Sequence, residues 1–157
     1  MTYNKESGEV SAIVRRNGEV ETTRTKRSFA RFVATGAETN GQFGLYEWNM
    51  QPRSGGSDPH FHRKFSESFF ITAGTVEIYN GTEWVLSSPG DFVHVPAGGI
   101  HAFRNVSDEP ASMMVIFAPG EAREEYFREL MDISNNERKL SEAEWATLYD
   151  KYDNTLA

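Results

Sequence analysis

The sequence contains no cysteine. This absence excludes disulfide bonds, thiolate zinc sites, iron–sulfur clusters and cysteine nucleophiles. No segment approaches the ~18 consecutive apolar residues of a membrane-spanning helix, and the first eight residues lack the apolar stretch of a signal peptide. We therefore expect neither membrane insertion nor export, and the cytoplasm is the expected location.

Positive charge is also in short supply. The 16 lysines and arginines are outnumbered by 23 aspartates and glutamates, which gives a formal net charge of −7. Such a charge repels phosphate backbones and anionic lipid headgroups, so we expect no nucleic-acid or membrane partner. The 157 residues suit one domain. We expect it to span 1–157, with a core over about 10–118 and a helical extension over about 121–153.

Short strand-like segments separated by Gly, Pro and Asn make up most of the chain. Two Asn-Gly pairs supply the positive φ angles of tight turns. They predict two hairpins, one joining 11–16 to 19–25 and the other joining 75–79 to 83–86. The longest apolar segment, 111–118, predicts a buried strand. Many short strands at this spacing favour an all-β fold, either a sandwich or a small barrel.

Two helices are expected after Pro119 and Gly120. From Glu121 onward apolar residues recur at helical spacing, and acidic residues occupy the first turn, where the helix dipole favours them. A second helix begins at Ser141, because Glu144 completes a capping box with it. The ends of the chain, residues 1–8 and 153–157, are expected to be frayed.

Three of the residues best suited to chemistry lie close together in the sequence. His60 and His62 occupy alternate positions and share one face of a strand. Glu67 begins the next segment, and a hairpin between 60–62 and 67–73 would turn all three side chains inward. Imidazole and carboxylate are ligands that borderline divalent metals accept without thiolates, and burying them without a metal leaves polar groups unpaired. The pattern indicates a metal site.

The spacing of these residues resembles the two motifs of the cupin superfamily. The first is His60-x-His62, four residues, Glu67, six residues, Gly74, with Ser54 where the family pattern has its leading glycine. The second matches at every defining position: Gly90, five residues, Pro96-x-Gly98, two residues, His101, three residues, Asn105. The resemblance implies a cupin jelly-roll β-barrel with two C-terminal α-helices. It also implies one divalent transition metal per chain, bound by His60, His62, Glu67 and His101.

Three imidazoles and one carboxylate leave coordination positions open, which favours Fe, Mn, Ni or Co, with Zn as a further option. The ligand set and the trailing helix resemble single-domain, quercetin 2,3-dioxygenase-like cupins. That resemblance implies a dioxygenase-type oxidoreductase acting on a small aromatic or enolisable substrate, with Glu67 as general base, and a homodimer. Because the fold hosts many functions, a non-catalytic small-molecule or metal-binding cupin and a metal-assisted lyase or isomerase stay open.

Aromatic side chains are candidates for the wall of a substrate pocket, although most aromatics in a small barrel belong to its core. The candidates are Tyr46, Trp48, Phe69, Phe103 and Phe117. Phe69 and Phe103 are favoured because each lies two residues from a proposed ligand and shares its face. The remaining histidine, His94, falls outside both motifs, and we expect it at the surface or in packing.

Overall fold

The computed structural model describes residues 3–9 and 11–157. Antiparallel strands form most of this part of the chain, preceded by a 3-10 turn at Asn17–Glu19. The largest sheet has six strands in the order β1 (Thr22–Arg24), β2 (Ser28–Ala34), β3 (Gly44–Met50), β11 (Ala111–Ala118), β6 (Ser66–Ala73) and β9 (Phe92–Val95).

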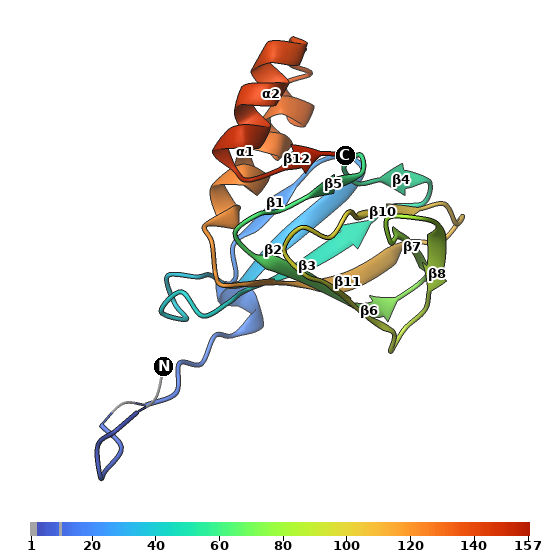
Figure 1. Cartoon of the computed structure of the whole chain (residues 1–157). Coiled ribbons are helices and arrows are strands. Elements are labelled where there is room, and N and C mark those ends of the chain that lie inside the picture. The colour runs from blue at the N-terminus through green and yellow to red at the C-terminus, as the bar shows by residue number, and fades with distance from the viewer. Residues whose placement is uncertain (1–2, 10) are drawn as a thin grey trace.

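A second sheet faces the first, and a short pair of strands lies beside them (Figure 1). The second sheet has the order β4 (Ser54–Gly55), β10 (Ala102–Asn105), β7 (Val76–Tyr79) and β8 (Trp84–Ser87). The short pair consists of β5 (His60–Phe61) and β12 (Thr155–Leu156). Phe103 of β10 contacts Phe69 of β6 and Trp48 of β3, with ring centroids 5.8 and 6.0 Å apart. The inner faces of the two larger sheets therefore share one core.

The expected all-β core with two C-terminal helices is confirmed, but the sheets are open. Among the described residues the six-stranded sheet ends at β1 and β9, and the four-stranded sheet ends at β4 and β8. The expected closed barrel is thus replaced by two facing antiparallel sheets, an arrangement that is consistent with a jelly roll. β11 lies inside the large sheet, and its residues alternate between buried and half-buried, as the two-residue period of a strand requires.

Helices α1 (Arg123–Asn135) and α2 (Glu142–Lys151) lie together at one end of the sheets (Figure 1). Phe127 of α1 packs on the large sheet, with its ring centroid 5.2 Å from that of Tyr46 and 6.3 Å from that of Phe32. The expected capping box of α2 is confirmed, because Ser141 accepts from the Glu144 amide and Glu144 accepts from the Ser141 amide. In the described part of the chain, neither helix is long and apolar enough to cross a membrane.

The two expected hairpins have different outcomes. The second is confirmed, since β7 pairs with β8 from Val76↔Ser87 to Tyr79↔Trp84. The first is wrong: residues 11–16 form no strand, and the amide of Glu19 donates to the carbonyl of Arg16 to close a local turn. Residues 11–16 are all exposed, so the Asn-Gly turn has no buried face against which a hairpin can form.

The strand that carries His60 pairs with the end of the chain, which corrects two further expectations. β5 pairs with β12, with Thr155 opposite Phe61, whereas residues 66–73 pair with β11 and β9. The expected hairpin between 60–62 and 67–73 is therefore wrong. Residues 153–157 are also not frayed; we call them the C-terminal strap. At the other end, residues 3–8 are exposed, and residues 1, 2 and 10 lie outside the described part.

Candidate metal centre

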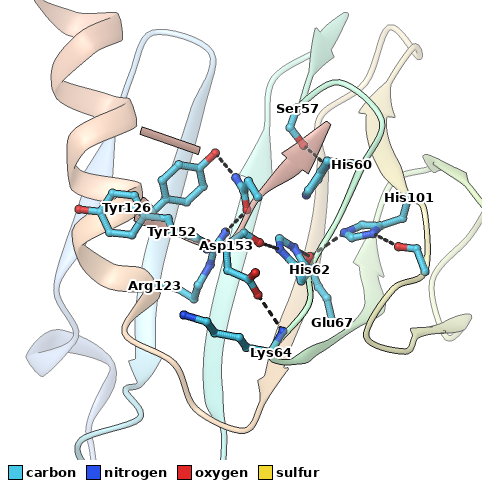
Figure 2. Close-up of polar contacts among 12 residues, drawn as sticks. Ser57, His60, His62, Lys64, Glu67, His101, Arg123, Tyr126, Tyr152 and Asp153 are labelled. Carbon is cyan, nitrogen blue, oxygen red and sulfur yellow. Dashed lines mark hydrogen bonds and ion pairs between the residues drawn. The ribbon is translucent and has the colours of Figure 1, made fainter. Parts of the chain in front are cut away.

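The four proposed ligands lie in one buried cluster (Figure 2). His60 comes from β5, His62 from the loop that follows it, Glu67 from β6 and His101 from the position before β10. Each offers a ligand atom, and these atoms all lie within 4.8 Å of one another. The four residues are at most 5% exposed. Segments far apart in the sequence thus place three imidazoles and one carboxylate in one small space.

The two motif loops are held together by backbone contacts. The amides and carbonyls of His60 and His101 exchange hydrogen bonds of 3.0 and 2.9 Å. The amide of Gly98 donates to the carbonyl of His62 at 2.7 Å. Gly98 has a φ of 84°, a left-handed conformation that favours glycine, which explains the glycine of the second motif.

Each ring is oriented through its Nδ1 atom by a backbone carbonyl. Nδ1 of His60 lies 2.9 Å from the Asp58 oxygen, and Nδ1 of His101 lies 2.9 Å from the Gly99 oxygen. Nδ1 of His62 lies 2.7 Å from the oxygen of Asp153, in the C-terminal strap. A carbonyl only accepts hydrogen bonds, so Nδ1 carries the proton in all three rings. In a neutral ring the lone pair is then on Nε2, the nitrogen that binds a metal.

The contacts of Glu67 indicate that a cation fits the cluster. Its Oε2 atom lies 3.0 Å from Nε2 of His62 and 2.8 Å from Nε2 of His101. With Nδ1 protonated, a neutral imidazole offers only a lone pair at Nε2, and an ionised carboxylate also offers only lone pairs. Facing acceptors in a buried site require either an additional proton on a ring or a cation between them. Three nitrogens and an oxygen suit a divalent transition metal.

The electrostatics of the metal-free cluster show how its charges balance when an additional proton on a ring, rather than a cation, lies between these groups. Burial raises the pKa of Glu67, but the hydrogen bonds from His101 and His62 outweigh it and hold that pKa below its usual range. Burial lowers the pKa of His101, but its hydrogen bond to Glu67 outweighs this effect and raises it. For His60, burial and then the neighbouring His101 lower the pKa to about 4. His60 is therefore neutral at pH 7 and can act as a ligand.

A cavity of about 350 Å³ adjoins the cluster and is lined by both His60 and Glu67. The sheets and the two helices contribute its aromatic wall: Trp48, Phe103, Phe117, Tyr126, Phe127, Trp145 and Tyr149. Three of the five aromatic residues proposed from the sequence are therefore at the cavity.

The other two proposed aromatic residues do not line this cavity. Phe69 is fully buried between the sheets, in contact with Phe103. Tyr46 is fully buried under α1, and its hydroxyl donates to the Glu124 carboxylate at 2.6 Å. Sharing a strand face with a ligand places Phe69 inside the fold but not at the cavity. His94 lies exposed on β9, apart from the cluster, with its Nδ1 atom 2.8 Å from the Ser68 hydroxyl.

Sequence reasoning missed the contribution of the C-terminal region. Arg123 and Asn154 line the cavity. Asp153 orients His62, as Figure 2 shows. One signal was available for Arg123: it precedes Tyr126 and Phe127 by three and four residues, so it lies on the apolar face of its helix. No local signal marks Asp153 and Asn154, because their roles depend on pairing between β12 and β5.

Comparison with known proteins agrees with the motifs. The cupin domain family model matches residues 46–117. Quercetin 2,3-dioxygenase of Bacillus subtilis (strain 168) is 29% identical over 116 residues, which are 74% of this chain and 34% of that protein. The uncharacterized protein SCO3923 of Streptomyces coelicolor is 31% identical over 85 residues, which are 54% of this chain and 76% of that protein. The chain thus spans about a third of the length of the Bacillus relative.

Solved structures show the same fold. A Bacillus subtilis oxalate decarboxylase, studied for its Mn(II) centres, superposes with a TM-score of 0.63 at 19% sequence identity. The match covers 76% of this chain and 32% of that one. The two motifs, the facing sheets, the family match and these relatives together show that the chain belongs to the cupin superfamily.

Proposed function

We propose that this chain is a metal-dependent dioxygenase-type oxidoreductase that acts on a small aromatic or enolisable substrate in the cavity. The observation that carries the proposal is the cluster, whose three Nε2 lone pairs and one carboxylate converge beside a cavity with an aromatic wall. The likeness to quercetin 2,3-dioxygenase supports the reaction class. A dioxygenase transfers both oxygen atoms of O₂ to its substrate, so the reaction needs no external reductant.

One divalent transition metal per chain is the proposed cofactor, with Fe, Mn, Ni or Co favoured and Zn as a further option. His60, His62, Glu67 and His101 would hold it. When bound, such a metal would polarise a hydroxyl or carbonyl oxygen of the substrate and lower the pKa of the hydroxyl proton or of a C–H proton next to the carbonyl. The ligand set leaves coordination positions open for that oxygen.

Glu67 is the proposed proton acceptor. Among the described residues that line the cavity it is the only carboxylate, and its oxygen lies in the cluster where a substrate hydroxyl would arrive. The pKa of Glu67 is held below its usual range, so the carboxylate carries no proton of its own. The aromatic wall would position a planar substrate and exclude water from the substrate once it has lost its proton.

Oxygen uptake tests this function directly. Flavonols, catechols and 1,3-diketones are assayed in an oxygen electrode with the Fe, Mn, Ni and Co forms, and we expect uptake coupled to product with at least one pair. Glu67→Gln should reduce turnover more than metal content, because the amide still coordinates weakly but does not accept a proton. Product without oxygen uptake would instead support a lyase or isomerase. Tight binding of small molecules without any turnover would support a non-catalytic cupin.

The assembly is a separate proposal. β1 is an edge strand of the six-stranded sheet, and an edge strand presents unpaired backbone groups that a second copy can pair with. We propose a cytoplasmic homodimer that pairs through this N-terminal strand, with residues 1–157 forming a single domain. Light scattering coupled to size exclusion tests it: a dimer mass is expected, and a monomer mass at micromolar concentration would contradict it.

A further inference from the structure

Two buried hydrogen-bond donors lack a partner among the described residues, and both belong to residues that line the cavity. They are Nε1 of Trp48 and Nε of Arg123. Trp48 is 9% exposed and Arg123 is 4% exposed, so bulk solvent does not supply the missing acceptors. An indole N–H and a guanidinium N–H only donate. A buried unsatisfied group requires an explanation, and here the missing partner is an acceptor.

The two residues that carry these donors lie near the same aromatic ring. The Trp48 and Phe127 ring centroids are 5.3 Å apart, and the guanidinium carbon of Arg123 lies 5.8 Å from the centroid of Phe127. Trp48 reaches the cavity from β3, whereas Arg123 reaches it from the first turn of α1. Trp48 and Arg123 therefore lie next to the same ring and belong to the lining of the same cavity.

The charge of Arg123 specifies the kind of acceptor. Its Nη1 donates to the carbonyl of Tyr152 at 2.5 Å and its Nη2 donates to Oδ1 of Asn154 at 3.1 Å. Both acceptors are uncharged, and aromatic rings surround the guanidinium, although the carboxylates of Glu67 and Asp153 act on it electrostatically. Arginine stays protonated in proteins, so the cavity contains a buried positive charge.

Positive side chains outnumber carboxylates in the described lining of the cavity. Arg27 and Arg123 are positive, and Glu67, whose charge acts on Arg123, is also engaged in the cluster. A bound divalent metal would add further positive charge. An anionic ligand is therefore favoured in this cavity, even though the chain carries a net charge of −7.

We propose that Trp48 and Arg123 form a specificity subsite for an anionic oxygen acceptor, such as the carboxylate or phenolate of a small aromatic molecule. Trp48 contributes one N–H donor, and Arg123 contributes an N–H donor and the charge. The ligand's place beside the metal cluster rests on the proposed function, whereas the subsite itself rests on the two donors. The subsite therefore acts in the metal-free protein as well.

Three aromatic probes of similar size and different charge test the subsite: benzoate, benzyl alcohol and benzylammonium. Their dissociation constants are measured by NMR titration with metal-free and Zn-loaded protein. We expect benzoate to bind about tenfold more tightly than benzyl alcohol in both forms, and benzylammonium not to bind. Equal affinities for the three probes in the metal-free protein would overturn the inference.

Trp48→Phe removes the donor and keeps an aromatic ring in its place. Benzoate affinity should fall about tenfold, with a smaller loss for benzyl alcohol. Trp84→Phe is the matched control, because Trp84 lies on β8 under the guanidinium of Arg104 and does not line the cavity. An unchanged benzoate affinity in Trp48→Phe would remove Trp48 from the subsite. Arg123→Met should abolish the preference for the anion, with its fold checked by circular dichroism.

The outcomes also separate this inference from the proposed function. Benzoate binding that requires zinc would place the anion on the metal and overturn the subsite, while leaving the dioxygenase proposal intact. Anion-selective binding without zinc, together with no oxygen uptake on any substrate, would uphold the subsite and reject the dioxygenase.

Discussion

His60 and His101 are oriented from within their own motifs, whereas His62 is oriented from the opposite end of the chain. The carbonyls of Asp58 and Gly99 each lie two residues from the ring that they hold. The carbonyl of Asp153 is 91 residues away from His62. Three rings with one function thus have two kinds of support. The carbonyls of Asp58 and Gly99 belong to the motif segments themselves, whereas that of Asp153 reaches His62 only when the C-terminal strap is in place.

The remote support is itself well anchored. The carboxylate of Asp153 accepts from the amide of Arg63 at 2.9 Å and from that of Lys64 at 2.8 Å. Figure 2 shows the contact with Lys64. Beyond Asp153, β12 pairs with β5, and the amide of Ala157 donates to the carbonyl of Pro59 at 3.0 Å. The strap therefore binds both sides of His62 in the sequence. The difference teaches that a short metal-binding motif can depend on a segment that no motif contains.

Removing His60 and His62 takes away one locally oriented ring and the remotely oriented ring, and should have the largest effect on metal binding. The His60→Ala, His62→Ala double variant should lose the one metal per chain expected of the native protein, because only Glu67 and His101 remain of the cluster. Elemental analysis of purified protein measures this content. His94→Ala is the control, since His94 is exposed and lies outside the cluster. Full metal retention in the double variant would reject the assignment.

Removing the metal alone leaves every support in place but takes away the cation that joins them. A ligand at a hundredfold excess over its Kd stabilises the folded state by about 2.7 kcal/mol. For a chain of this size, chelation should then lower the melting temperature by roughly 5–10 °C. Differential scanning calorimetry before and after chelator treatment measures the shift. An unchanged melting temperature after verified metal removal would show that the site adds little to stability.

Weakening the strap breaks only the remote support. Asp153→Ala removes the acceptor for Arg63 and Lys64 and places alanine at a φ of 54°, which strains the backbone. Loss of groups that orient metal ligands typically weakens metal affinity about 10–100-fold. Asp153→Asn should lose less, because asparagine tolerates this φ and keeps a side-chain acceptor.

Competition with a chromogenic chelator measures these metal affinities. Asp150→Ala is the matched control, since Asp150 is an exposed acid three residues earlier. Equal metal affinity in Asp153→Ala and Asp150→Ala would show that the local supports suffice.

Acidification of the metal-free protein tests how burial of His60, a locally oriented ring, affects stability. The pKa of His60 is about 4 in the folded chain, against 6.5 when unfolded. Between these values the unfolded state binds a proton that the folded state does not, so stability falls as pH falls through this window. The expected loss from pH 7 to pH 5 is about 1–2 kcal/mol. Urea unfolding at both pH values should show a smaller loss for His60→Gln than for the native chain; equal losses would contradict this account.

The sequence predicts the elements whose signals are local. Residues 111–118 form β11 because a continuous apolar segment suits a strand inside a sheet, and Ser141 starts α2 because its capping box is satisfied within one turn. The sequence does not predict pairings between strands that are far apart along the chain. The motif spacing gives the four members of the cluster, but nothing near His60 indicates that β5, only two residues long, pairs with the end of the chain.

The cavity lining was also predicted only in part from the sequence. Trp48, Phe103 and Phe117 were recognisable as aromatic candidates, but alternation along a strand does not tell whether an inward ring meets a cavity or another ring. Phe69 meets Phe103, and the fold therefore keeps it in the core. Opposite the sheets, the wall comes from α1 and α2, and Phe127 of α1 packs against Tyr46 and Trp48 of the large sheet.

Anomalous diffraction from crystals of the metal-loaded protein tests the central claim most directly. The account predicts one peak per chain, bound by the Nε2 atoms of His60, His62 and His101 and by the carboxylate of Glu67. The Nδ1 atoms should still contact the carbonyls of Asp58, Asp153 and Gly99. A peak outside the cluster, or a metal bound with His62 turned away from Asp153, would contradict it.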